Sequence, residues 1–407
     1  MLKINSFPLL FLKRTVYHAI KSINESPTLY SIPSARISAG RMQAWIIYYY
    51  GDNQQFTLSD SIQIPIILSP KDVLIKVLSS SINPIDIRRR EGYGSKLIDT
   101  YQSMKNILQL GGNQVNKLHF PLILGRDFCG EIVRKGPKVT KFNIGDKVGV
   151  YGALNVTRQG SFAQYCAAGE DEICLKPNNI SDEEASALPL VSLTSWYAIR
   201  KFSGFTEENA LRKRALLIGA SGGVGHVATQ LLKNLGMEIT ALCSPDSFDY
   251  IRQLGAEDAV NYREKDWLVE LSRKPKYDII FDTVGPRYYS FELMSSLLNR
   301  GGTFVTIVTP IFRNVDKYGL ISGLSRTVYQ ATKQSLFGLS NNVNYRWAVY
   351  TADGKVLNEI KKLVEQNKLK IKLDSKKFSF ENIPQAISYL ENGHAKGKVV
   401  INYSSFQ

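Results

Sequence analysis

The sequence predicts an α/β protein of two domains, one rich in β-strands and the other built on a doubly wound parallel sheet. First, an apolar strand, a glycine turn and an amphipathic helix follow one another without a break over residues 215–235. Second, strand and helix patterns alternate after this point, as they do in parallel sheets. Third, strand patterns divided by Pro, Gly and Asp dominate before it. A chain of 407 residues with 44% hydrophobic content is long enough for two cores.

The glycine turn predicts a site for the diphosphate of a dinucleotide. Gly219, Gly222 and Gly225 allow a sharp reversal, a close approach of backbone amides to a ligand, and tight packing of the following helix. The helix pattern that confirms this context consists of Val224, Val227, Ala228, Leu231, Leu232 and Leu235. The alternative is a tight strand-to-helix turn that binds nothing.

The remaining elements follow from hydrophobic periodicity and turn residues. Strands are predicted at 44–50, 73–78, 131–133 and 146–150, and a helical region begins at the acidic residues 182–184. Beyond the glycine turn, strands are predicted at 238–243, 259–262, 277–284, 303–308 and 398–402, with helices at 248–254 and 356–367. Residues 92–120 are interpreted as an ordered loop, either a cap over the site or a surface insertion.

The N-terminal segment differs in charge from the rest of the chain. Residues 1–41 hold six Lys and Arg but one acid, Glu25, out of a formal charge of +15 for the whole chain. A basic, acid-poor start with Ser and apolar residues is typical of a mitochondrial transit peptide. A surface tail is the alternative.

Composition limits the other classes of function. No apolar stretch approaches the roughly 18 to 20 residues that cross a bilayer, so no transmembrane span is expected. The four cysteines form no Cys-x-x-Cys pair, which argues against a disulfide framework and a structural zinc site. Basic residues alternate with acids and form no stripe with aromatics, so no nucleic-acid partner is expected. A basic surface would still attract anionic cofactors and anionic lipid head groups.

Several motifs together resemble the zinc-free, quinone-oxidoreductase-like branch of the medium-chain dehydrogenase/reductase superfamily. They are SINPIDIR at 81–88, FPLILGRDFCGEI at 120–132, NIGDKV at 143–148, LPLVSLTSW at 188–196, GASGGVG at 219–225 and GHAKGKVVI at 393–401. The resemblance implies a GroES-like catalytic domain at 42–182 and 351–407, with a Rossmann domain inserted at 183–350. The cofactor is expected in the cleft between them.

The resemblance also implies chemistry without zinc. The two positions that alcohol dehydrogenases of this superfamily fill with Cys and His hold Asn83 and Arg126. Neither is a thiolate or imidazole ligand. Asn83 is the predicted polar group facing nicotinamide and substrate, and Tyr93 is a weaker candidate donor. The alternatives are an Asn-Pro turn for Asn83 and a helix-start or fold-holding role for Asp86.

The expected cofactor is NADPH. The end of the second strand, where NAD enzymes place an acid, holds Ser244, and a hydroxyl does not repel a 2′-phosphate. Tyr262 and Arg263 match the family element that adds to this pocket, whereas Asp246 is expected to cap the next helix. The further contacts implied by the resemblance are Ser221, Gly223 and Val224 at the diphosphate, Thr194 near the nicotinamide, and Thr309, Tyr345, His394, Ala395 and Lys396. Thr194 is alternatively an ordinary helix residue, and 394–396 a simple turn.

The favoured function is hydride transfer from NADPH to a quinone, which needs alignment and a dry cleft more than a strong acid. The resemblance connects it with coenzyme Q biosynthesis, and implies partners among coenzyme Q biosynthesis proteins or a reticulon at the mitochondrial membrane. A homodimer is left open. One alternative is a 2-enoyl thioester reductase in which Tyr93 protonates the α-carbon. The other is a non-catalytic NADPH-binding interaction protein.

Overall fold

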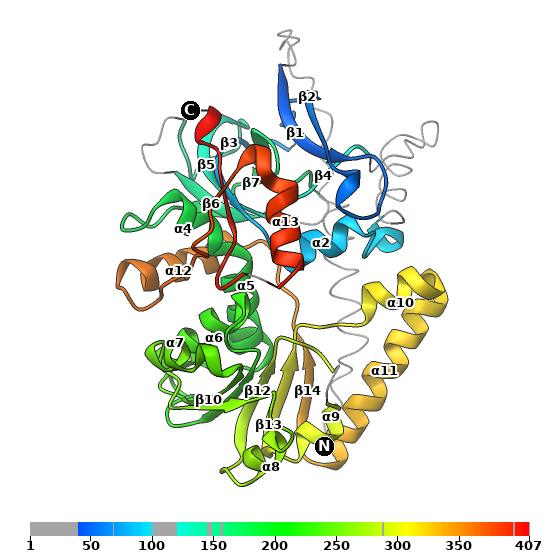
Figure 1. Ribbon diagram of the computed structural model, residues 1–407, viewed down its shortest axis with the longest axis vertical. Helices are drawn as coiled ribbons and strands as arrows, with labels where there is room; N and C mark the ends of the chain where they lie inside the picture. Colours follow the sequence, from blue (N-terminus) through cyan, green and yellow to red (C-terminus); the bar gives the residue numbers. More distant parts are fainter. Residues whose placement is uncertain are drawn as a thin grey trace.

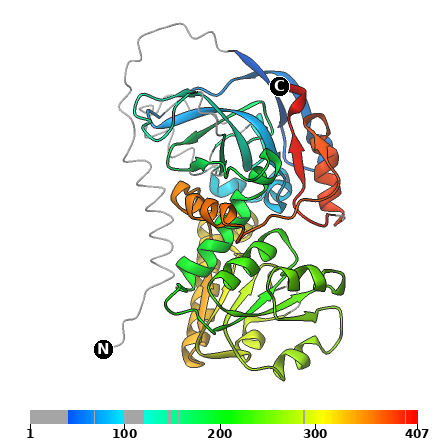
Figure 2. The same cartoon turned by 90° about the vertical axis from the view of Figure 1, so that its left-hand side faces the viewer.

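The computed structural model describes residues 40–67, 69–98, 100, 120–144, 149–154, 158–286, 289–393 and 395–406. Two lobes lie one above the other in Figures 1 and 2, with the C-terminus in the upper lobe. The predicted transit peptide falls outside the described residues except at its end. There, β1 (Arg41–Ile47) begins at Arg41, and the end of the transit peptide at residue 41 stays a prediction.

The upper lobe is the predicted β-rich domain. Its larger sheet has the order β15-β16-β3-β5-β6-β8, with β7 also paired to β3, and a smaller sheet has the order β2-β1-β4. The other strands are β2 (Thr57–Gln63), β3 (Asp72–Ser81), β4 (Leu122–Ile123), β5 (Asp127–Lys135), β6 (Val150–Ala153), β7 (Tyr165–Gly169), β8 (Ile173–Leu175), β15 (Phe378–Ser379) and β16 (Val400–Asn402). The C-terminal tail therefore completes a sheet begun near the N-terminus, because β16 pairs with β3.

Short helices surround this lobe. They are α2 (Pro84–Arg90), α4 (Asp182–Ala187), α12 (Gly354–Glu365) and α13 (Ile383–Glu391), with single 3-10 turns at Asn53–Gln55, Phe380–Asn382 and Ser404–Phe406. In α4, Ser181 and Glu184 cap each other's backbone amides, which explains why the acidic run starts a helix. Figure 1 places α12 beside α4 and α5, where the two lobes meet.

The lower lobe contains a six-stranded parallel sheet of order β11-β10-β9-β12-β13-β14. Its strands are β9 (Arg214–Ile218), β10 (Glu238–Cys243), β11 (Asp258–Asn261), β12 (Tyr277–Asp282), β13 (Leu298–Thr306) and β14 (Asn344–Trp347). Counted along the chain, this is the order 3-2-1-4-5-6 of dinucleotide-binding folds. The order in which successive strands are added to the sheet reverses at β9, and β9 ends in the glycine turn.

Helices cover both faces of this sheet. They are α5 (Pro189–Trp196), the π-helix η2 (Tyr197–Phe202), α6 (Gly223–Asn234), α7 (Phe248–Gln253) after a 3-10 turn (Pro245–Ser247), α8 (Trp267–Ser272), α9 (Phe291–Ser295), α10 (Ile311–Tyr318) and α11 (Leu320–Ser340). Ala215 and Leu217 face the core shared with α5 and α6, whereas Leu216 and Ile218 face the core shared with α8 and α9. This alternation is the signature of a strand buried on both sides.

The sequence did not predict α10 and α11. Figure 1 shows them as a hairpin along the outer side of the lower lobe, reaching toward α2 of the upper lobe. In the sequence, Gly323 and Gly338 interrupt the hydrophobic pattern of α11, and the outward side of this helix is also partly apolar. The contrast between apolar and polar positions that marks a helix is therefore weak. No helix within the described ranges is long and apolar enough to cross a membrane.

Candidate cofactor and active site

The glycine turn after β9 has the geometry that its spacing predicts. Gly219 has a φ of +78°, and a Cβ there would overlap the Thr283 hydroxyl. A Cβ on Gly225 would overlap the carbonyl oxygen of Gly219. Only glycine meets both demands, since the first needs the left-handed region and the second needs contact between helix and turn.

The start of α6 fits a diphosphate. Gly222 is its N-cap and has no side chain that could cap the helix. A Cβ on Gly222 would meet only the Gly219 oxygen, at 3.3 Å. Ser221 and Gly222 are exposed, and Gly223 and Val224 are half-buried. Uncapped amides at a helix N-terminus with open space above them suit an anion. The predicted diphosphate contacts therefore lie together.

The predicted 2′-phosphate residues also lie together. Ser244 follows β10, and Tyr262 follows β11, the strand paired with β10. Asp246 was expected to cap the next helix, and that expectation is wrong. The N-cap of α7 is Ser247, and the Asp246 carboxylate lies 3.6 Å from the Arg263 guanidinium. Arg263 thus lies beside the predicted 2′-phosphate pocket and forms an ion pair with the exposed Asp246.

Three other predicted cofactor residues are spread over different elements. Thr194, in α5, donates its hydroxyl to the Leu190 carbonyl at 2.7 Å, as an ordinary helix threonine does. Thr309 is nearly buried after β13. Tyr345 packs on Phe291, and its hydroxyl accepts from Trp347 Nε1 at 2.8 Å. Thr194 and Tyr345 have partners within the protein, and the contact of all three residues with a cofactor stays a prediction.

The tail residues divide between the surface and the interior. His394 lies outside the described residues. Ala395 packs on the upper core, and Lys396 is exposed, with its amide donating to Asp374 at 2.6 Å. Lys398, two residues further along the chain, is only 4% exposed. A Cβ on Gly223 would lie 3.6 Å from Cδ of Lys398. The buried lysine next to the glycine turn is therefore Lys398.

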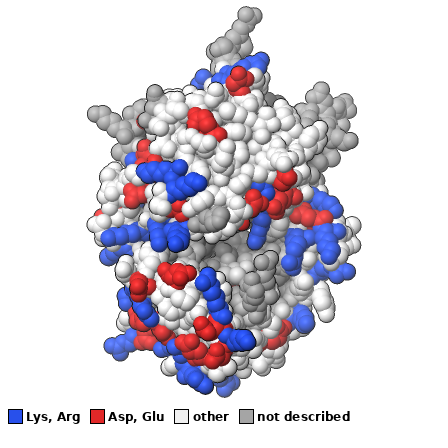
Figure 3. All heavy atoms as spheres, viewed as in Figure 1, with Lys and Arg blue, Asp and Glu red and all other residues white. Residues whose placement is uncertain are grey.

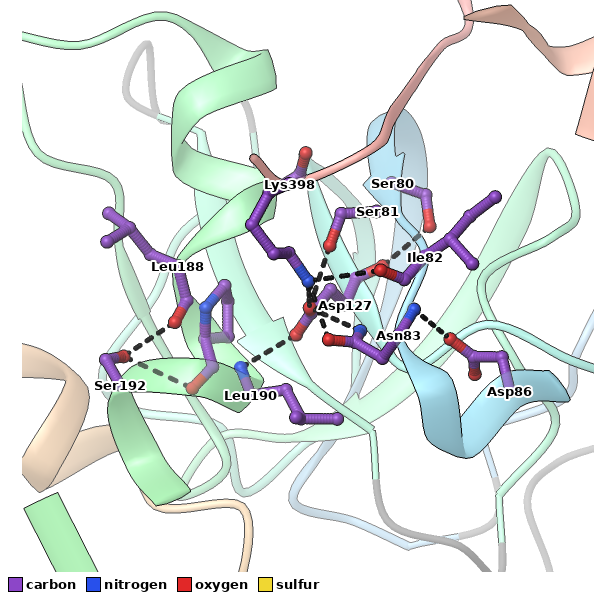
Figure 4. Close-up of polar contacts among 12 residues, drawn as sticks. Ser80, Ser81, Ile82, Asn83, Asp86, Asp127, Leu188, Leu190, Ser192 and Lys398 are labelled. Atoms are coloured by element: carbon purple, nitrogen blue, oxygen red, sulfur yellow. Dashed lines mark hydrogen bonds and ion pairs between the residues drawn. The ribbon is translucent and has the colours of Figure 1, made fainter. Parts of the chain in front are cut away.

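Asn83 joins a buried polar network (Figure 4). It is the N-cap of α2 and 1% exposed. Its Nδ2 donates to Asp127 at 2.8 Å, and its Oδ1 accepts from Lys398 at 2.6 Å. Both ends of the amide are thus engaged, and Asp86 accepts from its backbone N–H at 2.9 Å. These contacts make Asn83 a positioning residue, and its predicted contact with substrate stays a proposal.

Asp127 is the centre of this network. Its Oδ2 accepts from Ser81 at 2.8 Å and from Lys398 at 3.2 Å, and its Oδ1 accepts from the Leu190 amide at 2.8 Å. Asp127 is fully buried, and a buried carboxylate needs this full complement of donors. Through these bonds β3, β5, α5 and the tail are fastened together at one point. Sequence reasoning missed both Asp127 and Lys398, although each is a charged residue inside an apolar motif.

More buried charges surround the network. Burial raises the pKa of Asp86 to about 6, against the lowering effect of Arg126. Burial lowers the pKa of Arg126, and the half-buried Tyr350 is near enough to oppose that shift. Arg89 is 2% exposed, and its Nε and Nη1 have no partner among the described residues. Three cations and two carboxyls give this end of the site an excess of positive charge.

Tyr93 lies apart from that network. It follows the C-terminal end of α2, whereas Asn83 caps the other end. Its ring packs on Phe312 of α10, with ring centroids 5.3 Å apart, and Arg88 lies over it at 5.9 Å. Burial raises its pKa, so the phenol stays protonated at neutral pH. The structure therefore does not bring Tyr93 and Asn83 into direct contact.

The buried His226 and the cysteines are further titratable groups of the interior. His226, in the first turn of α6, lies 3.1 Å from the Gly222 carbonyl through Nδ1, and burial lowers its pKa to about 4. It is therefore neutral. The four cysteines are buried and free, and burial raises the pKa of each thiol. They are not nucleophiles at neutral pH.

These residues fit a nicotinamide dinucleotide. The glycine turn would hold the diphosphate, and Ser244 with Tyr262 would hold the ribose. They do not fit zinc: a guanidinium such as Arg126 offers no lone pair, and the Asn83 amide is already engaged. Within the described ranges, no group of three or more His, Cys, Asp or Glu is arranged to hold a metal ion.

Comparison with known proteins agrees with this geometry. Residues 69–184 match the alcohol dehydrogenase GroES-like domain, and residues 254–401 match the zinc-binding dehydrogenase family. The chain is 34% identical over 378 residues to the mitochondrial NAD(P)H oxidoreductase RTN4IP1 of Bos taurus, covering 93% of each chain. The chain belongs to the medium-chain dehydrogenase/reductase superfamily. The human RTN4IP1 is 33% identical over 378 residues, with the same coverage.

Membership of this superfamily confirms the predicted α/β fold and the likeness to a reticulon-interacting oxidoreductase, for which residues 308–310 and 345–348 also argue. The relatives named mitochondrial NAD(P)H oxidoreductase support the predicted oxidoreductase, its nicotinamide cofactor and its mitochondrial location. Among solved structures, the quinone oxidoreductase of Coxiella burnetii is 26% identical, with a TM-score of 0.71, covering 89% of this chain and 99% of that one.

Proposed function

We propose that this superfamily member transfers a hydride from NADPH to a quinone-type acceptor and serves coenzyme Q biosynthesis. The observation that carries the proposal is the meeting of two surfaces. In the glycine turn, at the point where the strand order reverses, a Cβ on Gly223 would lie 3.6 Å from Cδ of Lys398 in the buried network. Ligands of such sheets bind at this reversal, so a bound cofactor would lie against the catalytic domain.

The acceptor class follows from the charges at that point. Reduction of a quinone places negative charge on its oxygens, and cations held in a buried site stabilise such charge. Arg89, Arg126 and Lys398 are each at most 4% exposed. The likeness to the Coxiella burnetii quinone oxidoreductase supports the same acceptor.

The chain's own residues would position the reactants rather than react. NADPH supplies the hydride when bound. The amides at the start of α6 bind the diphosphate, and the Asp127 network keeps α5 and the tail in register beside it. Tyr93 keeps its proton at neutral pH and can donate a hydrogen bond from the α10 side. Alignment in a site closed to water contributes most of the rate enhancement in such reactions.

The test is NADPH oxidation by the purified protein with a panel of quinones and enoyl thioesters. Quinone turnover is expected, and turnover of enoyl thioesters alone would reject the proposal. A Ser244→Asp variant should lower the preference for NADPH over NADH by about tenfold or more, because its carboxylate repels the 2′-phosphate. Ser272→Asp, which adds the same charge at an exposed site on α8, is the control. An unchanged preference would mean that the phosphate pocket lies elsewhere.

The second candidate is reduction of a conjugated double bond. The chain is 29% identical over 387 residues to the 2-methylene-furan-3-one reductase of Solanum lycopersicum. In this reaction Tyr93 would protonate the carbon next to the carbonyl, as proposed for a 2-enoyl thioester. A Tyr93→Phe variant separates the two functions, because only the second requires the phenolic proton.

The third candidate is an NADPH-binding protein without turnover, whose partners are coenzyme Q biosynthesis proteins or a reticulon. The name of the Caenorhabditis elegans relative, reticulon-4-interacting protein 1, supports the reticulon. If Gly222→Val abolishes NADPH binding but leaves the cellular phenotype intact, this third function is favoured over catalysis.

A further inference from the structure

Helix α11 carries a mainly apolar stripe that the described part of the chain leaves uncovered. Residues at three- and four-residue intervals share one face of a helix, and here that face holds Ile321, Ser325, Val328, Thr332, Leu336 and Leu339, with Tyr329 beside it. Ile321 is 82% exposed, Tyr329 69%, Leu336 61% and Leu339 72%. Over this length the stripe extends about 27 Å. We name these seven residues the α11 stripe.

The opposite face of α11 accounts for how the helix is held. Gly323, Thr327, Ala331 and Gly338 are buried. A Cβ on Gly323 would overlap the Val315 backbone, so α10 and α11 are in close contact, and Asn314 donates to the Thr327 hydroxyl at 3.0 Å. The helix is thus held to the protein by its buried face, and the α11 stripe lies on the side that does not pack on α10.

The charges near the stripe favour an anionic surface. Residues 320–340 contain Arg326 and Lys333 and no acid. In α10, Arg313 and Lys317 accompany a single acid, Asp316. Figure 3 shows Lys and Arg side chains gathered at the right-hand edge of the molecule, at the level of α10. An apolar helix face with basic flanks is typical of helices that lie in the interface of anionic membranes.

The hairpin is also connected to the catalytic domain. Asp316 accepts from the amides of Gly94 at 2.6 Å and Lys96 at 3.4 Å. Phe312 packs on Tyr93. A Cβ on Gly94 would lie 2.9 Å from the Phe312 ring, so this segment is in close contact with α10. A surface that binds α11 would therefore also lie close to the segment that carries Tyr93.

We propose that the α11 stripe docks on an anionic phospholipid surface and so holds the Tyr93 segment next to a membrane that contains the acceptor. The docking stands on the stripe and its charges alone. The delivery of a membrane-dissolved quinone rests on the proposed function. The stripe would bury its apolar side chains in the interface, while Arg326 and Lys333 meet lipid phosphates.

The test is flotation of the full chain with vesicles of phosphatidylcholine alone or mixed with phosphatidylglycerol. The wild type should bind the mixed vesicles at least about tenfold better. Leu336→Glu with Leu339→Glu should lower that binding by about tenfold or more, since two large apolar side chains are lost from the interface. Arg326→Glu with Lys333→Glu should lower it as well. The control is Leu211→Glu, at an apolar residue that is 67% exposed in the loop before β9, and it should bind as the wild type does.

Two outcomes would overturn the docking proposal: binding that is equal in both vesicle types, or binding that survives loss of Leu336 and Leu339. A third would replace it. If sedimentation shows that the leucine variant converts a dimer to a monomer, the stripe is an interface between two copies of the chain. Turnover of a water-soluble quinone by the leucine variant keeps this test separate from the proposed function, because docking is not needed for a soluble acceptor.

Discussion

The two sides of the site are built in opposite ways. On the lower lobe, the glycine turn contributes backbone: Ser221 and Gly222 are exposed, Gly223 and Val224 are half-buried, and these residues act by leaving space and free amides. On the upper lobe, Asp127, Asn83 and Lys398 contribute charged and polar side chains that are at most 4% exposed. The first side leaves room for a ligand, whereas Asp127, Asn83 and Lys398 are already hydrogen-bonded to one another.

This difference teaches where each side is vulnerable. Substitution in the turn acts through sterics on a few atoms, so its effect depends on which glycine changes. Substitution in the network acts through desolvation, because a buried charge that loses its partner has no water to replace it. Substitutions in the Asp127 network are therefore expected to have strongly coupled effects on stability. Substitutions in the glycine turn are expected to have separate effects that depend on the residue.

The largest effect is expected at Gly225. Gly225→Ala places a methyl group on the Gly219 carbonyl, so the turn and α6 must separate. NADPH affinity should fall by about 100-fold or more, since the diphosphate site is formed by both. The control is Ser272→Ala, at an exposed residue of α8 outside the turn, and it should bind NADPH as the wild type does. Fluorescence titration measures both, and an affinity of Gly225→Ala equal to that of the control would contradict this reading of the turn.

The next effect concerns the network. Lys398→Met leaves the Asp127 carboxylate buried without its cation and should lower the free energy of unfolding by about 3 to 5 kcal/mol. Asp127→Asn in the same chain should restore more than half of the loss, because the Asn83 amide can then turn over to satisfy it. Denaturant unfolding of the two single variants and the double variant measures the coupling. Additive losses would show that the two residues do not act as a unit.

The third effect is a pH dependence from His226, beneath the turn. The unfolded chain binds a proton near the ordinary pKa of 6.5, but the folded chain only near 4. The contribution of the neutral His226 to the free energy of unfolding is fully present at pH values above the pKa of the unfolded chain. It is lost as the pH falls toward the pKa of the folded chain. Between about pH 7 and about pH 5 it amounts to about 2 kcal/mol. His226→Asn should flatten this part of the stability profile, whereas an unchanged profile would assign the acid sensitivity to other groups.

The smallest effect is expected at the exposed ion pair beside the phosphate pocket. Asp246→Asn should change the free energy of unfolding by less than about 0.5 kcal/mol, because exposed pairs contribute little. It should raise NADPH affinity by about twofold, since Arg263 then meets the 2′-phosphate without competition, and leave NADH affinity unchanged. A fall in NADPH affinity would instead show that Asp246 positions Arg263.

The same contrast explains what the sequence could predict. The turn was predictable because glycine spacing, the strand before it and the helix after it are all local, and the parallel sheet followed from the alternation of strands and helices. Asp127 and Lys398 are far apart in sequence, and their pairing depends on a tail strand that returns to β3. Lys396 carries the same charge as Lys398, and only the fold shows which of the two is buried. The α10–α11 hairpin was missed because its outer face is apolar.

The most direct test of the account is a single turnover of the purified protein with a quinone and NADPH that carries deuterium at the transferable hydrogen. The account predicts one quinol for each NADPH consumed, a primary isotope effect, and loss of both in Gly222→Val. Consumption of NADPH by enoyl thioesters, with every quinone left unreduced, would contradict it.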